Sequence, residues 1–243
     1  MPGRFLSGPR QGTSIDAAAW TTSEAQAEIK VATDSQHKHR VAPNILDRQF
    51  WPSAPNQAWG ADITYLWTQQ GWVYLAVVID LYSRRVAGWS ADRHMKKAFV
   101  IRALTMAINL RKPLSGLVCH SNQGGQYASD DNQKLLQRHA IVCSLCRRGN
   151  CWDNAPIERF FGSLKREWTG NCWYRTRHDA IADVREYVAV YYNAKRLHST
   201  LGYATPNDYE KGLILLTTTE RVDVGAFRRA VRPSRVRGFE SLG

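Results

Sequence analysis

The stretch "VCHSNQGGQY", residues 118–127, is predicted to hold the end of a buried strand and the polar, glycine-rich loop that follows it. A rigid strand fixes the side chain that comes after it, so such a loop is a common place for an active site. Asn122 occupies this position and carries no charge. Two acids occupy comparable positions: Asp62 opens the first predicted strand, and Glu158 lies in a helix, with 35 residues between Asn122 and Glu158.

The helix that holds Glu158 is predicted to begin near Pro156, with Asp153 or Asn154 as its cap. One face of this helix carries apolar residues at the spacing of a buried face: Ile157, Phe160, Phe161, Leu164 and Trp168. Glu158, Gly162 and Lys165 form an adjacent stripe that is expected to run along the edge of a sheet. Such a stripe is either an ordinary solvated face or a surface for a charged ligand.

The elements around these residues are predicted from the period of the apolar positions. Residues 62–91 are typical of three antiparallel strands, and the central run "WVYLAVVID" is apolar enough for a strand buried on both faces. A helix is predicted in "KKAFVIRALTMAINL", a strand in "SGLVCHS", a second helix in "DDNQKLLQRHA" and a strand in "IVCSLC". This order of elements predicts an α/β fold with a five-stranded mixed sheet flanked by helices.

The composition indicates a folded protein with a basic surface. The chain has 243 residues, of which 44% are hydrophobic, and its net charge is +12. Basic residues exceed acidic residues within 51–210 as well as over the whole chain, which fits a nucleic-acid partner. No apolar run is long enough to cross a membrane and no signal peptide is recognised, so the expected location is the cytoplasm.

The five cysteines do not suggest a disulfide framework, because their number is odd and a secretory signal is absent. Cys143 and Cys146 form one CxxC pair. A structural zinc site needs four ligands, and neither a second CxxC nor an HxxxH lies at suitable spacing. Buried free thiols are the preferred interpretation.

Several motifs in this order resemble a known family, the DDE recombinases with a retroviral-integrase-like core, and within it the second-reading-frame transposases of bacterial insertion sequences. The matching motifs cover roughly residues 40–210: "APNQAWGADITYLW", "GWVYLAVVIDLYSRRVAGWS", "HSNQGGQYAS", "RRGNCWDNAPIERFFGSLKRE" and "YYNAKRLHSTLGYATPNDYE". The resemblance implies an RNase H-like fold. It also implies two Mg²⁺ or Mn²⁺ ions held by three acids, which support hydrolysis at a DNA 3′ end and transfer of the new 3′-hydroxyl to target DNA.

Carried over to this chain, the resemblance assigns the catalytic and metal positions to Asp62, Asn122 and Glu158. Asn122 stands where the family has an aspartate, and an amide brings no negative charge to offset two dications. We therefore predict an impaired catalytic site. Asp130 and Asp131 are explained by their place at a helix start, and Asp80 belongs to the family pattern beside the triad, so neither group is expected to replace the missing acid.

The predicted DNA-binding residues lie on the Glu158 helix and near a second motif of the family. They are Gly162, Lys165, Arg159, Arg166, Lys195, Arg196 and His198. Tryptophans such as Trp59, Trp72, Trp89 and Trp152 could stack on bases, although core packing is the simpler interpretation for the first three.

Three regions and three alternative functions follow. Residues 1–50 are predicted to be an irregular arm without a complete helix-turn-helix, 51–210 the integrase-like core, and 211–243 a basic, disordered tail. The chain is expected to be a transposase or a non-catalytic DNA-binding remnant that interferes with intact transposase. A nuclease for RNA hybrids is disfavoured by the flanking motifs. The expected partners are element-end and target DNA, the upstream reading-frame product or intact transposase, and further copies in a multimer.

Overall fold

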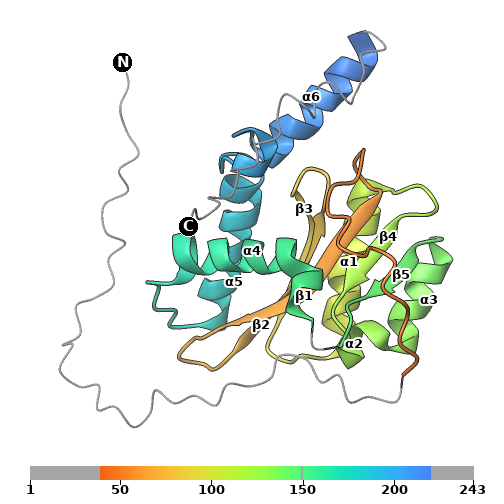
Figure 1. The fold of residues 1–243 in the computed structure, drawn as a ribbon. Helices are drawn as coiled ribbons and strands as arrows, with labels where there is room; N and C mark the ends of the chain where they lie inside the picture. Colours follow the sequence, from red (N-terminus) through yellow and green to blue (C-terminus); the bar gives the residue numbers. More distant parts are fainter. Residues whose placement is uncertain (1–38, 149, 220–243) are drawn as a thin grey trace, which may run out of the picture. The chain divides into compact units, whose positions relative to one another are not determined.

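The computed structural model describes residues 39–148 and 150–219, which build a five-stranded sheet with helices on both faces (Figure 1). The strands are β1 (Ala58–Leu66), β2 (Val73–Asp80), β3 (Val86–Asp92), β4 (Val118–Ser121) and β5 (Val142–Leu145). The helices are α1 (Lys97–Arg111), α2 (Gly125–Ala128), α3 (Asp130–Arg138), α4 (Ala155–Ser163), α5 (Arg177–Glu186) and α6 (Pro206–Thr219). The predicted α/β fold with a five-stranded sheet is confirmed.

The strand order is β3-β2-β1-β4-β5, with an antiparallel half and a parallel half. β1 pairs antiparallel with β2, and β2 with β3, whereas β4 runs parallel to both β1 and β5. The hairpin-like connections of the first three strands and the helical crossovers of the last two require this arrangement. The sheet is therefore mixed, as predicted.

Strand β1 begins at Ala58, so the prediction that Asp62 opens the strand is wrong. The four residues before Asp62 pair with the whole of β4, ending with Ala61 opposite Ser121. Trp59 and Ala61 are buried in this segment, and their burial favours the longer strand. Because Ala61 and Ser121 are partners, the next residues along the two strands, Asp62 and Asn122, are placed side by side.

The two faces of the sheet build two separate cores. On one face α1 and α3 pack on the sheet, with Phe99 and Leu136 in the same buried cluster as strand residues such as Val78. On the other face α4 and α5 cover the neighbouring strand positions, with Phe160 and Val184 in the same cluster as β2 residues. Successive β2 residues thus face opposite helical layers, which is why this strand is an almost continuous apolar run.

The predicted apolar face of the Glu158 helix packs into the second core. Ile157, Phe160, Phe161 and Leu164 are all buried, and Trp168 is partly buried against the same cluster. The helix is not a regular α-helix to its end, because α4 stops at Ser163 and a π-helical turn spans Leu164–Thr169. The wider turn changes the direction of the side chains that follow it.

Structure continues across both predicted region boundaries, at residues 50 and 211. Leu46 is buried in the core, and the Ser144 hydroxyl accepts hydrogen bonds from the backbone N–H groups of Ile45 (2.9 Å) and Leu46 (3.1 Å). Helix α6 runs through the predicted boundary at residue 211, since no proline interrupts the chain after Pro206. The predicted arm before residue 39 and the tail after residue 219 lie outside the described residues.

The four tryptophans singled out from the sequence differ in burial. Trp59 is fully buried and Trp72 and Trp89 are half-buried, whereas Trp152 has an exposed fraction of 68%. Core packing is thus the role of Trp59. Within residues 39–148 and 150–219, no helix has the length and apolar character that crossing a membrane requires.

Two glycines provide a matched test of the packing. A Cβ at Gly88 would clash with the carbonyl oxygen of Ala103 and lie 2.6 Å from the Ala107 nitrogen, whereas a Cβ at Gly162 would meet only Arg166 Nη2 at 3.9 Å. We expect Gly88→Ala to lower the free energy of unfolding by about 1–3 kcal/mol, because α1 must move away from β3. Gly162→Ala should leave it unchanged or raise it by up to about 1 kcal/mol. Urea denaturation of both variants measures this, and equal effects would contradict the packing.

Candidate active site

The structure brings two of the three predicted catalytic residues into direct contact. Asp62 lies in the middle of β1 and Asn122 directly after β4, and the Asn122 side-chain nitrogen donates a short hydrogen bond to Asp62 Oδ1. Glu158, in the first turn of α4, is the third member. Its charge acts on Asp62, so all three residues lie in one region at the β1–β4 edge.

The orientation of the Asn122 amide follows from its second hydrogen bond. Asn122 Oδ1 accepts the backbone N–H of Gly124 at a distance of 2.9 Å. This bond ties the amide oxygen to the loop, so the amide NH₂ group is the part that faces Asp62. An aspartate at this position would present a second carboxylate to Asp62, whereas the asparagine presents a hydrogen-bond donor.

The carboxylate of Asp62 is surrounded by donors. Oδ1 also accepts the backbone N–H of Ile63 at 2.8 Å, and Oδ2 accepts the amide of Asn154 at 3.0 Å. Burial raises the pKa of Asp62 to about 7, and the charge of Glu158 adds to this, while these hydrogen bonds act in the opposite direction. Desolvation also raises the pKa of Glu158, although much of its side chain is open to solvent.

Asn154 is a site residue that the sequence did not reveal. The sequence predicts Asp153 or Asn154 as a helix cap, and Asn154 does occupy the cap position of α4. Asn154 makes no capping bond and donates to Asp62 instead, and Asp153 accepts hydrogen bonds from Arg147 (2.7 and 2.9 Å) and Arg48 (2.9 Å). Hydrogen bonds from Arg147 hold the pKa of Asp153 well below its usual range. Asn154 lies four residues, or about one helical turn, before Glu158. This spacing was the sequence signal that could have placed Asn154 in the site.

Comparison with known proteins shows which family this arrangement belongs to. Residues 52–151 and 139–206 each match a model described as an integrase core domain. The transposase for insertion sequence element IS904 of Lactococcus lactis is 40% identical over 169 residues, which cover 70% of this chain and 67% of that protein. The chain belongs to the insertion-sequence transposases.

Two further relatives agree with the assignment to this transposase family, and a solved structure shares the fold. Transposase InsF for IS3A of Escherichia coli is 42% identical over 76% of this chain and 65% of that protein, and the 31 kDa protein of IS600 of Shigella sonnei is 40% identical over 74% and 66%. The chain thus spans about two thirds of the length of these relatives. The HTLV-2 integrase catalytic core domain in complex with magnesium has a TM-score of 0.50 and 19% identity, and the match covers 65% of this chain and 97% of that chain. This likeness confirms the RNase H-like fold.

The residues of this transposase chain do not fit the pair of divalent ions that the family resemblance implies. Both carboxylate oxygens of Asp62 accept amide N–H groups, and the amide oxygen of Asn122 is held by Gly124. In the part of the chain that the structure describes, no three His, Cys, Asp or Glu side chains gather in a way that could hold a metal ion. Two carboxylates and one inward-facing NH₂ group are a poor donor set for a hard cation.

The CxxC cysteines of the transposase are free thiols. Cys146 is buried, with its sulfur 3.3 Å from His120 Nε2, and Cys143 is partly buried. Burial raises the pKa of Cys146 to about 12. Both thiols therefore behave as small packing residues at neutral pH.

The predicted DNA-binding residues of α4 and of the π-helical turn that follows it lie at the surface. Lys165 Nζ lies 5.0 Å from the ring centroid of Tyr65, a residue of β1, and burial lowers the pKa of this lysine. Arg159 and Arg166 are exposed, and the space above Gly162 is open apart from Arg166. This helical segment thus presents two exposed guanidinium groups, and it places the Lys165 ammonium group against the Tyr65 ring.

The three basic residues of the second motif have different environments. Lys195 is exposed. Arg196 forms an ion pair with Glu167 at 2.6 Å and donates to Ser163 Oγ at 3.1 Å. His198 is buried edge-on against Tyr192, with the ring centroids 4.9 Å apart. Arg196 and His198 also contact one another, with Arg196 Nη1 3.4 Å from His198 Nδ1.

The burial of His198 predicts a pH-dependent stability. Burial, together with the nearby Arg196 and Arg84 cations, lowers the pKa of His198 from 6.5 to about 4, against a weaker opposing effect of Glu167. Below pH 6.5 the unfolded chain therefore binds a proton that the folded chain does not. We expect this imidazole to lower the free energy of unfolding by about 2 kcal/mol between pH 7 and pH 5.

Urea denaturation of the wild type and His198→Gln at both pH values isolates this effect. The variant should lose less stability than the wild type on acidification, because its side chain does not titrate. Parallel loss in the two proteins would show that His198 does not contribute.

Proposed function

We propose that this chain acts in DNA transposition and integration as the integrase-core part of an insertion-sequence transposase. The family reaction is hydrolysis of a phosphodiester at the 3′ end of the element, followed by attack of the freed 3′-hydroxyl on target DNA. In this proposal Asp62, Asn122 and Glu158 mark the reacting position. Family membership and the meeting of these three residues at one sheet edge support it.

One observation supports a slow reaction in this chain: the hydrogen bond from Asn122 to Asp62. A neutral donor occupies the place of the second acid, and it uses an Asp62 oxygen that would otherwise be available as a ligand. We propose that the chain binds DNA but cleaves and joins it much more slowly than an aspartate-containing relative. The same hydrogen bond favours a second function, competition with intact transposase for element ends.

The proposed partners follow from the reaction. Transposition joins two DNA ends to a target, so we propose a multimer on DNA that includes the upstream reading-frame product or intact transposase. Mg²⁺ or Mn²⁺, two ions in the family, is the proposed cofactor of a site in which residue 122 is an aspartate. Because the donor set of the present chain does not fit these ions, we propose that the partner chains supply the metal-binding sites.

The proposed DNA surface of the core is the stripe that contains Glu158, Gly162 and Lys165, flanked by Arg159 and Arg166. Phosphate contacts by basic side chains make the affinity depend on salt. We expect Lys165→Gln to weaken binding of element-end DNA several-fold and to reduce the salt slope by about 1. Fluorescence anisotropy at a series of salt concentrations measures both quantities.

Lys134→Gln is the matched control for this test, because Lys134 is exposed on α3 and its loss changes the net charge equally. Its affinity should stay close to that of the wild type. If Lys165→Gln and Lys134→Gln have the same salt slope, the α4 stripe is not the DNA surface. If the wild type does not bind element-end DNA, the proposed function itself is wrong.

A further inference from the structure

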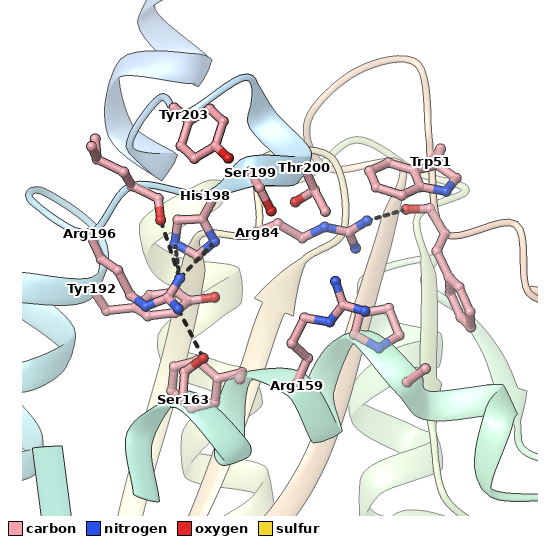
Figure 2. A pocket seen from close by; sticks show the side chains of 15 residues that line it. Trp51, Arg84, Arg159, Ser163, Tyr192, Arg196, His198, Ser199, Thr200 and Tyr203 are labelled. Carbon is pink, nitrogen blue, oxygen red and sulfur yellow. Dashed lines mark hydrogen bonds between the residues drawn. The ribbon is translucent and has the colours of Figure 1, made fainter. Parts of the chain in front are cut away.

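A pocket of about 360 Å³ lies between α4, the turn after β2 and the segment 196–203 (Figure 2). This volume falls within the range of small-molecule sites, about 300–1,000 Å³. The residues that line the pocket include Arg84, Arg159, Arg196, Ser199, Thr200 and Tyr203. Asp62, Asn122 and Glu158 do not line it, so the pocket is distinct from the candidate active site.

Arg84 is a buried cation that points into this pocket. Its exposed fraction is 8%, and its backbone has a φ of 62°, which is unusual for a residue other than glycine. Its guanidinium lies 4.4 Å from the Trp51 ring centroid and donates to the Phe50 carbonyl oxygen at 3.1 Å, while Nη1 has no hydrogen-bond partner. Within the described residues no acid forms an ion pair with Arg84, and a buried cation in this state is costly unless an anion joins it.

A second guanidinium faces the first across the pocket. Figure 2 shows Arg159 reaching up from α4 toward Arg84. Burial lowers the pKa of Arg84 to about 10, and the positive charge of Arg159 acts in the same direction. Arg196 is neutralised by its ion pair with Glu167. Two uncompensated positive charges therefore converge, together with the first turn of α4 at Ala155 and Pro156. Guanidinium groups match the oxygens of a phosphate well.

The remaining walls suit the rest of a nucleotide. Tyr203 has an exposed fraction of 70% and a φ of 61°, so a strained backbone holds an aromatic ring at the rim of the pocket. The hydroxyl groups of Ser199 and Thr200 lie near it in Figure 2. Exposed aromatic rings next to basic groups are the usual platform for unpaired bases.

We propose that this pocket binds one unpaired nucleotide of a DNA strand, with its phosphate between Arg84 and Arg159 and its base on Tyr203. The proposal rests on the proposed function, since it takes DNA as the ligand. Arg159 directly follows Glu158 and points about 100° away around the helix. A strand that passes Glu158 can therefore reach the pocket by crossing α4.

The test compares two DNA duplexes, one blunt and one with a short unpaired tail that carries the fluorescent base 2-aminopurine. In the wild type the tail should tighten binding roughly tenfold, and stacking should quench the base. Tyr203→Ala should lose this gain but still bind the blunt duplex, whereas Arg159→Gln should lose the gain and also bind the blunt duplex more weakly, because Arg159 flanks the proposed DNA surface. Both residues are exposed, so their substitution spares the fold, and Arg84→Lys provides a third variant at the buried position.

Two controls keep the interpretation specific. Tyr203→Phe retains the ring and should retain the quenching, and Arg138→Gln removes an exposed charge from α3 and should retain the gain. Equal binding of the two duplexes by the wild type, or an undiminished gain in Arg159→Gln and Tyr203→Ala, would overturn the pocket while leaving the proposed function intact. Binding of free dAMP or inorganic phosphate without any tail effect would assign the pocket to a free anion and overturn the proposal for a DNA strand. Failure to bind either duplex would contradict the proposed function.

Discussion

Asn122→Asp is expected to raise strand-transfer activity at least about a hundredfold, the size of effect that one electrostatic group in an active site commonly has. The substitution removes the NH₂ donor that faces Asp62 and supplies the acid that the family resemblance implies. The loop can still hold residue 122, because an aspartate oxygen accepts the Gly124 N–H as the amide oxygen does. Pre-cleaved element-end DNA and plasmid target in Mg²⁺ or Mn²⁺ provide the assay.

Two companion variants show whether the gain comes from the added acid. Asn122→Ala removes the amide without adding charge and should remain as slow as the wild type. Asp62→Asn in the Asn122→Asp background should abolish the gain. Equal, robust activity of wild type and Asn122→Asp would contradict an impaired site. If Asn122→Asp stays inactive while DNA binding is normal, the reaction needs the proposed partner chain.

Arg111→Met is expected to lower the free energy of unfolding by about 3–5 kcal/mol, the cost of leaving buried acids without their cation. Arg111 at the end of α1 contacts Asp80 of β2 at 3.1 Å and Glu210 of α6 at 2.8 Å. The three side chains are at most 10% exposed, and Glu210 also accepts a hydrogen bond from Ser83 at 2.6 Å. The network therefore ties α6 to the core, and chemical denaturation measures its loss.

Arg102→Met on the same helix is the control. Arg102 pairs with Asp92 at 2.6 Å, but its side chain is 51% exposed, so its loss should cost no more than about 1 kcal/mol. Similar losses in the two variants would contradict the distinction between a buried network and a surface pair. The network also gives Asp80 a structural role beside the candidate active site.

The order of strands and helices along the chain, and the burial of β2 on both faces, were accessible from the sequence because they follow from apolar periodicity. Successive apolar residues of β2 face α1 and α4 in turn. Burial of this strand on both sides could therefore be inferred before the structure was known. The start of β1 was not accessible, since Trp59 and Gly60 next to polar neighbours do not predict pairing with a distant strand. Parallel pairing of β1 with β4 decides it.

The candidate site was only partly predictable for a similar reason. The residues at 62, 122 and 158 could be named from motifs, but the direction of the Asn122 amide depends on the Gly124 N–H, and the role of Asn154 depends on tertiary contact with Asp62. The pocket around Arg84 was also missed, because Arg84 and Arg159 are far apart in the sequence. That Arg84 is buried without a paired acid becomes evident only in the folded structure.

The claim that Asn122 disables the metal site is tested most directly by titrating Mn²⁺ into the wild type and Asn122→Asp. The free ion is monitored by electron paramagnetic resonance. If the Asn122 amide occupies the place of a metal ligand, the wild type should bind no Mn²⁺ at the Asp62 site, and Asn122→Asp should gain binding that Asp62→Asn removes. Equal Mn²⁺ affinity in the wild type and Asn122→Asp, lost from both on Asp62→Asn, would contradict the claim that Asn122 disables this site.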